Sequence, residues 1–235
     1  MSGRSIAIIG DGKMGQAIRQ LAIENGWKVS AMLGERESAN GKGITSGTLG
    51  DADVAVEFTQ PDAAVANITA TLRAGAPIVV GTTGWYDELP EVTRIAKETG
   101  TGLLWSSNFS LGVNVMIELA RYAGTLMHPL EGFDAHIVET HHSRKKDAPS
   151  GTAIAIGKAA SDALDRPIPT TSIRTGSVPG THELIFDGMF EQLSLTHVAR
   201  DRRVFAEGAL QAAAWLIGKK GVFTMRDVLE LPARR

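Results

Sequence analysis

The sequence predicts an α/β protein with a doubly wound parallel sheet at its N-terminus and a second, α+β domain that contains a mixed sheet. Two observations predict this fold class. Over roughly the first hundred residues, short apolar runs alternate with longer amphipathic ones, as in strands joined by helices. Farther along the chain, strand-like runs follow one another with fewer helical stretches between them. We therefore expect a second domain to begin near residue 109.

Short apolar runs in the first domain are typical of buried strands. They cover residues 5–9, 28–32, 54–58, 78–80 and 103–105. The amphipathic segments between them are typical of helices, because their apolar residues recur at helical spacing. They cover residues 14–25, 61–74 and 88–99. Gly26 and Gly100 close two of these helices and Pro61 opens the third, which fits the residue preferences of helix ends.

The second domain is expected to mix strands and helices without strict alternation. Its strand-like runs cover residues 135–140, 181–186 and 192–198, and its helical segments cover residues 113–127 and 152–164. We expect the domains to span residues 1–108 and 109–206. A last helix at 208–218 lies in a segment, 207–235, that we expect to return to the first domain.

The composition argues against several classes of protein. Lysine and arginine total 24 against 26 acidic residues, so the near-neutral charge does not favour a nucleic-acid partner. The chain has no cysteine, which excludes disulfides, thiolate metal sites and a cysteine nucleophile. No apolar run approaches the ~20 residues that cross a bilayer, and the first residues lack the apolar core of a signal peptide. We therefore expect a soluble, cytoplasmic protein without membrane partners.

A glycine-rich turn lies between the first expected strand and the first expected helix. Its sequence, GDGKMG, fits the pattern G-x-G-x-x-G. Such glycines permit a tight turn, close approach of a pyrophosphate and close helix packing, and the helix N-terminus favours an anion. This context predicts a dinucleotide site of a Rossmann-type domain, with a purely structural turn as the alternative. The predicted cofactor contacts here are Gly10, Asp11, Gly12, Lys13, Met14 and Gly15.

Further loops follow the other expected strands, and ligands of open parallel sheets collect at the carboxyl ends of strands. After the second strand, Glu35 suits a ribose 2′-hydroxyl, whereas Arg36 suits a 2′-phosphate. Because neither signal excludes the other, we expect use of both NADH and NADPH. Two later loops add the cofactor candidates Gly81, Thr82, Thr83, Ser106, Ser107, Asn108 and Phe109. Solvated charges and ordinary turn chemistry are the alternatives for these loops.

Several segments, spread over nearly the whole chain, carry a specific resemblance. Besides the glycine turn they are VVGTTGW, NFSLGVNVM, ETHHSRKKDAPSGTA, IRTGSVPGTHELIF, LTHVARDRRVFAEGAL and GVFTMRDVL. In content and order they resemble the dihydrodipicolinate reductase family, the 4-hydroxy-tetrahydrodipicolinate reductases of lysine and diaminopimelate biosynthesis. The resemblance implies hydride transfer from NADH or NADPH to a cyclic imine with two carboxylates, yielding tetrahydrodipicolinate. It also implies a homotetramer assembled through the domain that binds the substrate.

The segment ETHHSRKKDAPSGTA carries the catalytic residues that the resemblance implies. His141 matches the family's proton donor, and Lys145 matches the lysine that holds the substrate and supports the same step. His142 matches a substrate contact. The residues that match the grip on a substrate carboxylate are Ser150, Gly151 and Thr152. The chemistry agrees, because an imidazole titrates near neutral pH and the N–H groups of an opening helix suit a carboxylate. A solvated basic surface is the alternative.

A later motif of the family is matched less specifically, and its role could equally be structural. The matching residues are Arg174, Gly176, Gly180 and His182. The sequence also departs from the family near the adenosine end of the cofactor. Many members have one more residue in the glycine turn and an arginine at the position of Lys13. The family's acidic residue after the second strand also aligns with Gly34 here, and the acid of this chain, Glu35, stands one place later. These departures leave the choice between NADH and NADPH open.

Two other functions remain as alternatives. A different Rossmann-type NAD(P)-dependent dehydrogenase would share the first domain but would not need the histidine-rich segment. A non-catalytic dinucleotide-binding sensor would not need His141 and Lys145. We expect no metal site, because adjacent histidines lack the i, i+4 spacing and carboxylate companions of a typical zinc site.

Overall fold

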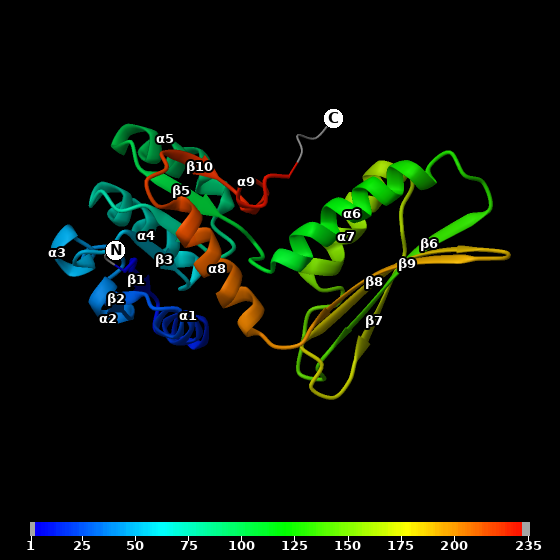
Figure 1. Ribbon diagram of the computed structural model, residues 1–235, viewed down its shortest axis with the longest axis horizontal. Coiled ribbons are helices and arrows are strands. Elements are labelled where there is room, and N and C mark those ends of the chain that lie inside the picture. Colours follow the sequence, from blue (N-terminus) through cyan, green and yellow to red (C-terminus); the bar gives the residue numbers. More distant parts are fainter. Residues whose placement is uncertain (1–2, 232–235) are drawn as a thin grey trace. The chain divides into compact units, whose positions relative to one another are not determined.

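The computed structural model describes residues 3–231, which divide into two compact units. The first unit combines the chain up to Phe109 with the chain from Phe205 onward, and the second is Ser110–Val204. Figure 1 shows that both ends of the described chain belong to the first unit. That the first unit binds the dinucleotide and the second binds the substrate stays a prediction.

The first unit contains a six-stranded parallel sheet of order β10-β5-β4-β3-β1-β2. Its strands are β1 (Ser5–Ile9), β2 (Lys28–Leu33), β3 (Val54–Glu57), β4 (Ile78–Val80), β5 (Gly102–Trp105) and β10 (Gly221–Phe223). β1, β3 and β4 are buried along their whole length, as expected of strands covered on both faces. β1 lies between β2 and β3, so the connection after β1 runs to one side of the sheet and the connection after β3 runs to the other. Such a reversal opens a crevice at the carboxyl ends of the two strands.

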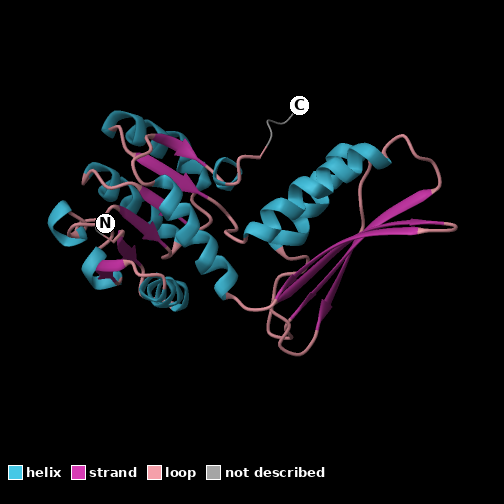
Figure 2. Ribbon diagram, viewed as in Figure 1, coloured by secondary structure: helices cyan, strands magenta, loops and turns pink. Residues whose placement is uncertain are grey.

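Helices flank this sheet, as Figure 2 shows. The longer ones are α1 (Lys13–Glu24), α4 (Pro61–Arg73), α5 (Leu89–Thr99) and α8 (Arg203–Leu216). The short ones are α2 (Glu35–Ser38), α3 (Ser46–Leu49), the 3₁₀ turn η1 (Tyr86–Glu88) and α9 (Met225–Val228). Fully buried Ile68 and Leu72 of α4 pack into the core beside the strands. Within the described residues, no helix has the length and apolar character needed to cross a bilayer.

The second unit contains a four-stranded mixed sheet of order β7-β6-β8-β9. Its strands are β6 (Phe133–His141), β7 (Thr170–Arg174), β8 (Gly180–Gly188) and β9 (Gln192–Ala199), and only the β6–β7 pair is parallel. Two helices, α6 (Leu111–Met127) and α7 (Gly151–Leu164), lie side by side along the sheet (Figure 1). Gly124 of α6 faces the Ala160 backbone and the Ala163 methyl group of α7, so a larger residue there would force the helices apart.

Alternation along β6 decides which side chains face the helices. Successive residues of a strand point to opposite faces, and in β6 Ala135, Ile137, Glu139 and His141 are buried, whereas the residues between them are only partly buried. Ala135 and Ile137 join the core with residues of α6 and α7. Glu139 and His141 therefore continue an apolar face with two ionisable side chains.

The predicted α/β fold is confirmed, with a Rossmann-type parallel sheet followed by a mixed sheet. Most predicted elements are found with ends displaced by one or a few residues, such as β3, which ends at Glu57 instead of residue 58. The predictions missed β7, β10 and the short helices. β7, with the sequence TTSIR, is mostly polar, and β10 has only three residues, so neither carries an apolar pattern long enough to detect.

Core packing in the first unit gives a direct stability prediction. Ile68→Ala should lower the free energy of unfolding by about 2–5 kcal/mol, because Ile68 is fully buried and its removal leaves a cavity. Ile23→Ala is the matched control, since Ile23 lies on α1 with 52% of its surface exposed and should change stability by less than about 0.5 kcal/mol. Urea unfolding followed by circular dichroism measures both. Equal losses in the two variants would contradict the assignment of the core.

Candidate active site

A hollow of about 650 Å³ lies at the carboxyl ends of β1 and β3, where the strand order reverses. Of the predicted cofactor residues, the hollow is lined by Gly10, Asp11, Gly12 and Glu35. Its remaining wall comes from residues that the sequence analysis missed, namely Ser38, Ala39, Asn40, Phe58, Thr59, Gln60, Asp62, Ala63 and Asn67. The position is the one at which open parallel sheets bind their ligands. The sequence offered a signal for these residues, because the segment TQP directly follows the strand expected at residues 54–58, at the end where ligands collect.

The three glycines of the turn differ in what surrounds them. Gly10 has a φ of +108°, and a side chain there would collide with the carbonyl oxygen of Phe58. A side chain at Gly15 would collide with the carbonyl oxygen of Gly10. No atom lies within 4 Å of the position that a Cβ of Gly12 would take. Gly10 and Gly15 are therefore required by the fold, whereas Gly12 leaves space that a ligand can enter at the start of α1.

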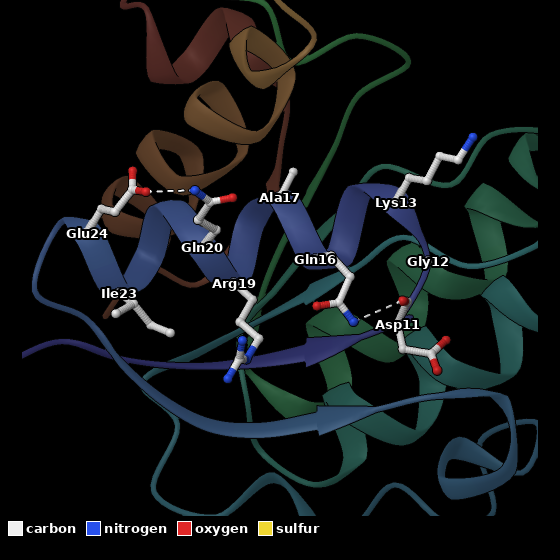
Figure 3. A pocket seen from close by; sticks show the side chains of 9 residues that line it. All are labelled: Asp11, Gly12, Lys13, Gln16, Ala17, Arg19, Gln20, Ile23 and Glu24. Carbon is white, nitrogen blue, oxygen red and sulfur yellow. Dashed lines mark hydrogen bonds between the residues drawn. The ribbon is translucent and has the colours of Figure 1, made fainter.

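The charged candidates near the turn do not all face the same hollow. Figure 3 shows Lys13 and Asp11 at the N-terminal end of α1 with side chains that point in different directions. Lys13 lines a second, open hollow along α1, together with Arg19 and Glu24. Arg36 is exposed on α2. Only Glu35, among the charged residues predicted after β2, lines the first hollow within the described chain.

Carboxylates gather where β2 ends. A side chain at Gly34 would lie 2.7 Å from Oδ2 of Asp11 and 2.9 Å from Oε2 of Glu37. These two acidic groups therefore approach the same point of the backbone, beside Glu35. The negative potential of three carboxylates favours hydrogen-bond donors such as ribose hydroxyls and disfavours a phosphate.

The loops after β4 and β5 mainly pack against the interior of the first unit. Gly81 lies against the ring of Phe58, which in turn packs on Phe109 with ring centroids 5.7 Å apart. Phe109 is almost fully buried. Thr82 accepts a hydrogen bond from the Thr59 backbone at 2.7 Å. In these two loops, Ser106 and Asn108 are partly buried, and Thr83 and Ser107 are exposed. None of the residues predicted in the loops lines the hollow at the glycine turn, and neither does Met14, which is partly buried on α1.

Glu57, at the end of β3, is a buried carboxyl that the sequence analysis missed. It is fully buried and bonded to the hydroxyl of Thr59, which also receives a hydrogen bond from Asn67 at 3.4 Å. Burial raises the pKa of Glu57 above its usual value, and the hydrogen bonds from Thr59, Thr82 and Asn67 oppose that shift only in part. Glu57 is thus bonded to two residues that line the hollow, Thr59 after β3 and Asn67 on α4, and to Thr82 in the loop after β4.

In the second unit, the end of β6 brings Glu139 and His141 together. They are two residues apart in a strand and share its buried face. Nδ1 of His141 is bonded to Oε2 of Glu139, and Oε1 of Glu139 accepts a hydrogen bond from Arg174 at 2.6 Å. Arg174 sits opposite His141 on β7. A carboxylate therefore bridges the imidazole and a guanidinium below the surface.

His182 and Ser150 form the other side of this group. His182 is paired with Glu139 across β6 and β8, and its ring lies edge-on to that of His141 with centroids 5.1 Å apart. Nε2 of His182 lies 3.1 Å from the hydroxyl of Ser150. That hydroxyl also caps α7 by accepting a hydrogen bond from the Ala153 backbone at 3.2 Å. The first turn of α7 is therefore fixed beside the two histidines.

Gly151 and Thr152 form that first turn of α7. No atom lies within 4 Å of the position that a Cβ of Gly151 would take, so the helix N-terminus is open there, as it is at Gly12. The two predicted anion sites thus have in common a helix N-terminus with open space around a glycine. They differ in the cap, because α1 has no side-chain cap and α7 is capped by the Ser150 hydroxyl.

Lys145 and His142 lie in the loop after β6. Nζ of Lys145 donates to both carboxylate oxygens of Asp147, at 2.8 and 2.7 Å. Asp147 is well exposed, so this pair can exchange for a contact with another carboxylate at little cost. Desolvation and then the charges of Arg202 and Arg144 lower the pKa of His142, which favours its neutral form.

Electrostatics separate the ionisable groups of this site. Burial would raise the pKa of Glu139, but hydrogen bonds from Arg174, Ser172 and His141 outweigh it and lower that pKa to about 2. Burial lowers the pKa of His182 to about 4, helped by the neighbouring charge of His141. Burial also lowers the pKa of His141, while Glu139 acts in the opposite direction. Glu139 is thus ionised at neutral pH and His182 is neutral.

The same cluster contains atoms that could bind a metal ion. One such atom from each of Glu139, His141 and His182 lies within 4.8 Å of the other two. The sequence did not reveal this group, because only the spacing of the adjacent His141 and His142 was considered. Both oxygens of Glu139 and Nε2 of His182 already bond protein groups. These contacts account for the arrangement without an ion. That the site needs no metal stays a prediction.

Comparison with known proteins agrees with the resemblance seen in the sequence. The family profile "Dihydrodipicolinate reductase, N-terminus" matches residues 4–109, and "Dihydrodipicolinate reductase, C-terminus" matches residues 112–229. A 4-hydroxy-tetrahydrodipicolinate reductase of Christiangramia forsetii is 37% identical over 239 residues, covering 96% of this chain and 97% of that protein. One of Paraburkholderia phymatum is 36% identical over 231 residues, covering 89% of this chain and 86% of that protein.

A solved structure shares the fold. It is a dipicolinate-bound dihydrodipicolinate reductase from Paenisporosarcina sp. TG-14, with a TM-score of 0.81 and 24% sequence identity over 96% of this chain and 99% of that one. Because both family profiles and both sequence relatives extend over most of its length, the chain belongs to the dihydrodipicolinate reductase family.

Proposed function

We propose that the chain is a 4-hydroxy-tetrahydrodipicolinate reductase, an NAD(P)H-dependent oxidoreductase of lysine and diaminopimelate biosynthesis. It reduces the cyclic imine product of dihydrodipicolinate synthase to tetrahydrodipicolinate, which takes up one hydride and one proton. The observation that carries the proposal is the buried pairing of Glu139 and His141 beside the open first turn of α7, in a member of this family. This arrangement combines a proton donor with an anion site.

The first unit suits the nucleotide. Gly12 leaves room for a pyrophosphate at the start of α1, and Glu35 offers a carboxylate to a ribose hydroxyl. When bound there, NAD(P)H supplies the hydride. The protein's own contribution is to hold the pyrophosphate against backbone N–H groups, which Gly10 and Gly15 allow by keeping the turn tight.

The second unit suits a dicarboxylate. Ser150, Gly151 and Thr152 begin α7, whose N–H groups and partial positive charge favour one carboxylate. Lys145 supplies a nearby cation and His142 a polar contact, and the exposed Asp147 that now binds Lys145 is easily displaced. The dipicolinate bound to the Paenisporosarcina relative is itself a dicarboxylate, which supports this assignment.

His141 is the proposed proton donor. Burial lowers its pKa in the free protein, so the imidazole needs help to hold a second proton at neutral pH. Glu139 gives part of that help, and a dianionic substrate nearby would add to it by favouring the positively charged imidazolium. Proton delivery is thereby linked to the presence of substrate. Lys145 stabilises negative charge that develops on the substrate during reduction.

A coupled assay tests the function itself. Freshly generated dihydrodipicolinate synthase product, mixed with the protein and NADH or NADPH, should cause substrate-dependent loss of absorbance at the reduced nicotinamide band. Turnover of a sugar or an amino acid instead would favour another dehydrogenase. Cofactor binding without any turnover would favour a non-catalytic sensor. We expect the reaction to take place in the cytoplasm and to need neither nucleic-acid nor membrane partners.

Substitution of the two proposed catalytic residues should slow the reaction in different ways. His141→Ala should lower kcat by roughly 10²–10⁴-fold through loss of the general acid. Lys145→Ala should lower kcat and raise KM, because its charge contacts the substrate before and during the reaction. The double variant should lose less than the product of the single losses. Near-normal kcat/KM in a folded single variant would remove that residue from the mechanism.

Both NADH and NADPH should serve as donors, with NADH preferred. Asp11, Glu35 and Glu37 gather near the end of β2 and would repel a 2′-phosphate, whereas Arg36, which is exposed next to Glu35 on α2, would attract one. We expect a kcat/KM ratio below about a hundredfold, which corresponds to about 2.7 kcal/mol. Arg36→Ala should weaken use of NADPH more than use of NADH. A preference for NADPH, or equal loss with both donors, would refute this reading of the site.

A homotetramer is the proposed assembly, and the open face of the four-stranded sheet supports self-association. Ile173 and Val198 lie on the face opposite the helices, where 42% and 56% of their surfaces are exposed. A second copy of the chain that covered this face would bury both side chains. Light scattering at assay concentration should give about four times the 24.9 kDa chain mass. A monomer at that concentration would contradict the proposal.

A further inference from the structure

Glu139 has a position that the chemistry of the site must explain. It is fully buried on the helix-facing side of β6, following Ala135 and Ile137, where an apolar residue would be expected. Its two oxygens are divided between partners, with Oε2 on Nδ1 of His141 and Oε1 on Arg174. An ionised carboxylate is costly to bury without such partners. The position of this charge on an otherwise apolar face therefore needs an explanation.

The contact with Nδ1 decides which nitrogen of His141 is available. A carboxylate accepts a hydrogen bond, so Nδ1 carries a proton and Nε2 is the atom left for exchange with a ligand. A Cβ at Gly180 would lie 3.1 Å from Nε2, so the glycine keeps that nitrogen clear of a side chain. Gly180 has a φ of +158°, at the edge of the left-handed region, in keeping with a glycine at this point.

We infer that Glu139 is the positioning residue for His141, fixing the proton on Nδ1, aiming Nε2 at the substrate and stabilising the imidazolium that donates the proton. The inference rests on the proposed function and deepens it. Glu139 touches neither substrate nor cofactor in this role and acts through the imidazole, as carboxylates do when they orient a catalytic histidine.

Arg174 completes the arrangement. Besides Glu139 it binds the backbone oxygen of Asp147 at 2.6 Å, so one guanidinium links β6 to the loop that carries Lys145. The charged and titratable groups facing His141 are thus Glu139 on β6, Arg174 on β7, His182 on β8 and Lys145 in the loop. Among these, Glu139 favours the protonated imidazole, while Lys145 and Arg174 disfavour it.

A purely structural role is the competing explanation, in which Glu139 only forms an ion pair with Arg174. The two explanations differ in what happens when the charge of Glu139 is removed but its size is kept. A structural role predicts lower stability with an unchanged pH profile. A positioning role predicts a lower pKa of His141, so that kcat falls at a lower pH as the solution is made more alkaline.

The test compares Glu139→Gln with Glu191→Gln, the same change in the same unit. Glu191 is exposed in the turn between β8 and β9, and it belongs neither to the site nor to the sheet face proposed for self-association. We expect Glu139→Gln to lower kcat roughly 10- to 1,000-fold, with KM and NADH affinity changed less than about threefold. The alkaline fall of kcat should move to lower pH. Glu191→Gln should keep the kcat, the KM and the pH profile of the wild type.

Nitrogen NMR of the His141 imidazole gives a readout that needs no turnover. The wild type should show a proton on Nδ1 and a higher pKa than Glu139→Gln. Should the Gln variant not fold, Glu139→Asp replaces it, with an expected intermediate kcat and a His141 pKa below that of the wild type. Unchanged kcat, pH profile and imidazole pKa in a folded variant would overturn the inference. Lack of turnover by the wild type would instead refute the proposed function, and the NMR comparison would still decide the role of Glu139.

Discussion

The desolvation of one carboxylate organises the second unit. Glu139 is held where water cannot reach it, so its charge must be balanced by the protein. Arg174 from β7 and His141 from the end of β6 provide the balance, and each is thereby fixed in place. Removing one partner from such a buried group typically costs 3–5 kcal/mol, because the remaining charge is left unpaired. The ion pair between neighbouring strands and the orientation of the imidazole are consequences of the same constraint.

In the first unit, a negative charge is expected to be balanced by backbone N–H groups instead of side chains. A pyrophosphate carries its own charge, so the protein needs N–H groups and space more than it needs cations. Gly10 and Gly15 bring β1 and α1 close together, and Gly12 faces open space. Gly151 repeats that openness at the start of α7. Two distant parts of the chain therefore share one local geometry, a helix that begins at or beside a glycine with open space around it, and this geometry suits the anions proposed for both places.

Sequence reasoning succeeded where a local pattern has one physical meaning. Alternating apolar and amphipathic runs predicted a parallel sheet, and the glycine turn predicted a crevice at the carboxyl ends of its strands; the structure has the sheet and a hollow at that place. It failed where the partner is distant in sequence. Glu139 could have been noticed, since it is two residues before His141 in an alternating strand, but its link to Arg174 depends on the pairing of β6 with β7. β7 itself has too little apolar character to be recognised. Likewise, Asn67 reaches the crevice only because α4 packs beside β3.

The discontinuous first unit has a consequence for how the chain folds during its synthesis. β10 pairs with β5, yet more than a hundred residues separate these two strands. Until residues 221–223 have left the ribosome, β5 presents an unpaired edge, and Phe109 lacks α8, whose Gly208 lies against its carbonyl group. The second unit is continuous and can complete its own contacts earlier. A nascent chain would thus carry a complete second unit within an incomplete parallel sheet, and β5 would remain an exposed strand edge until β10 is added.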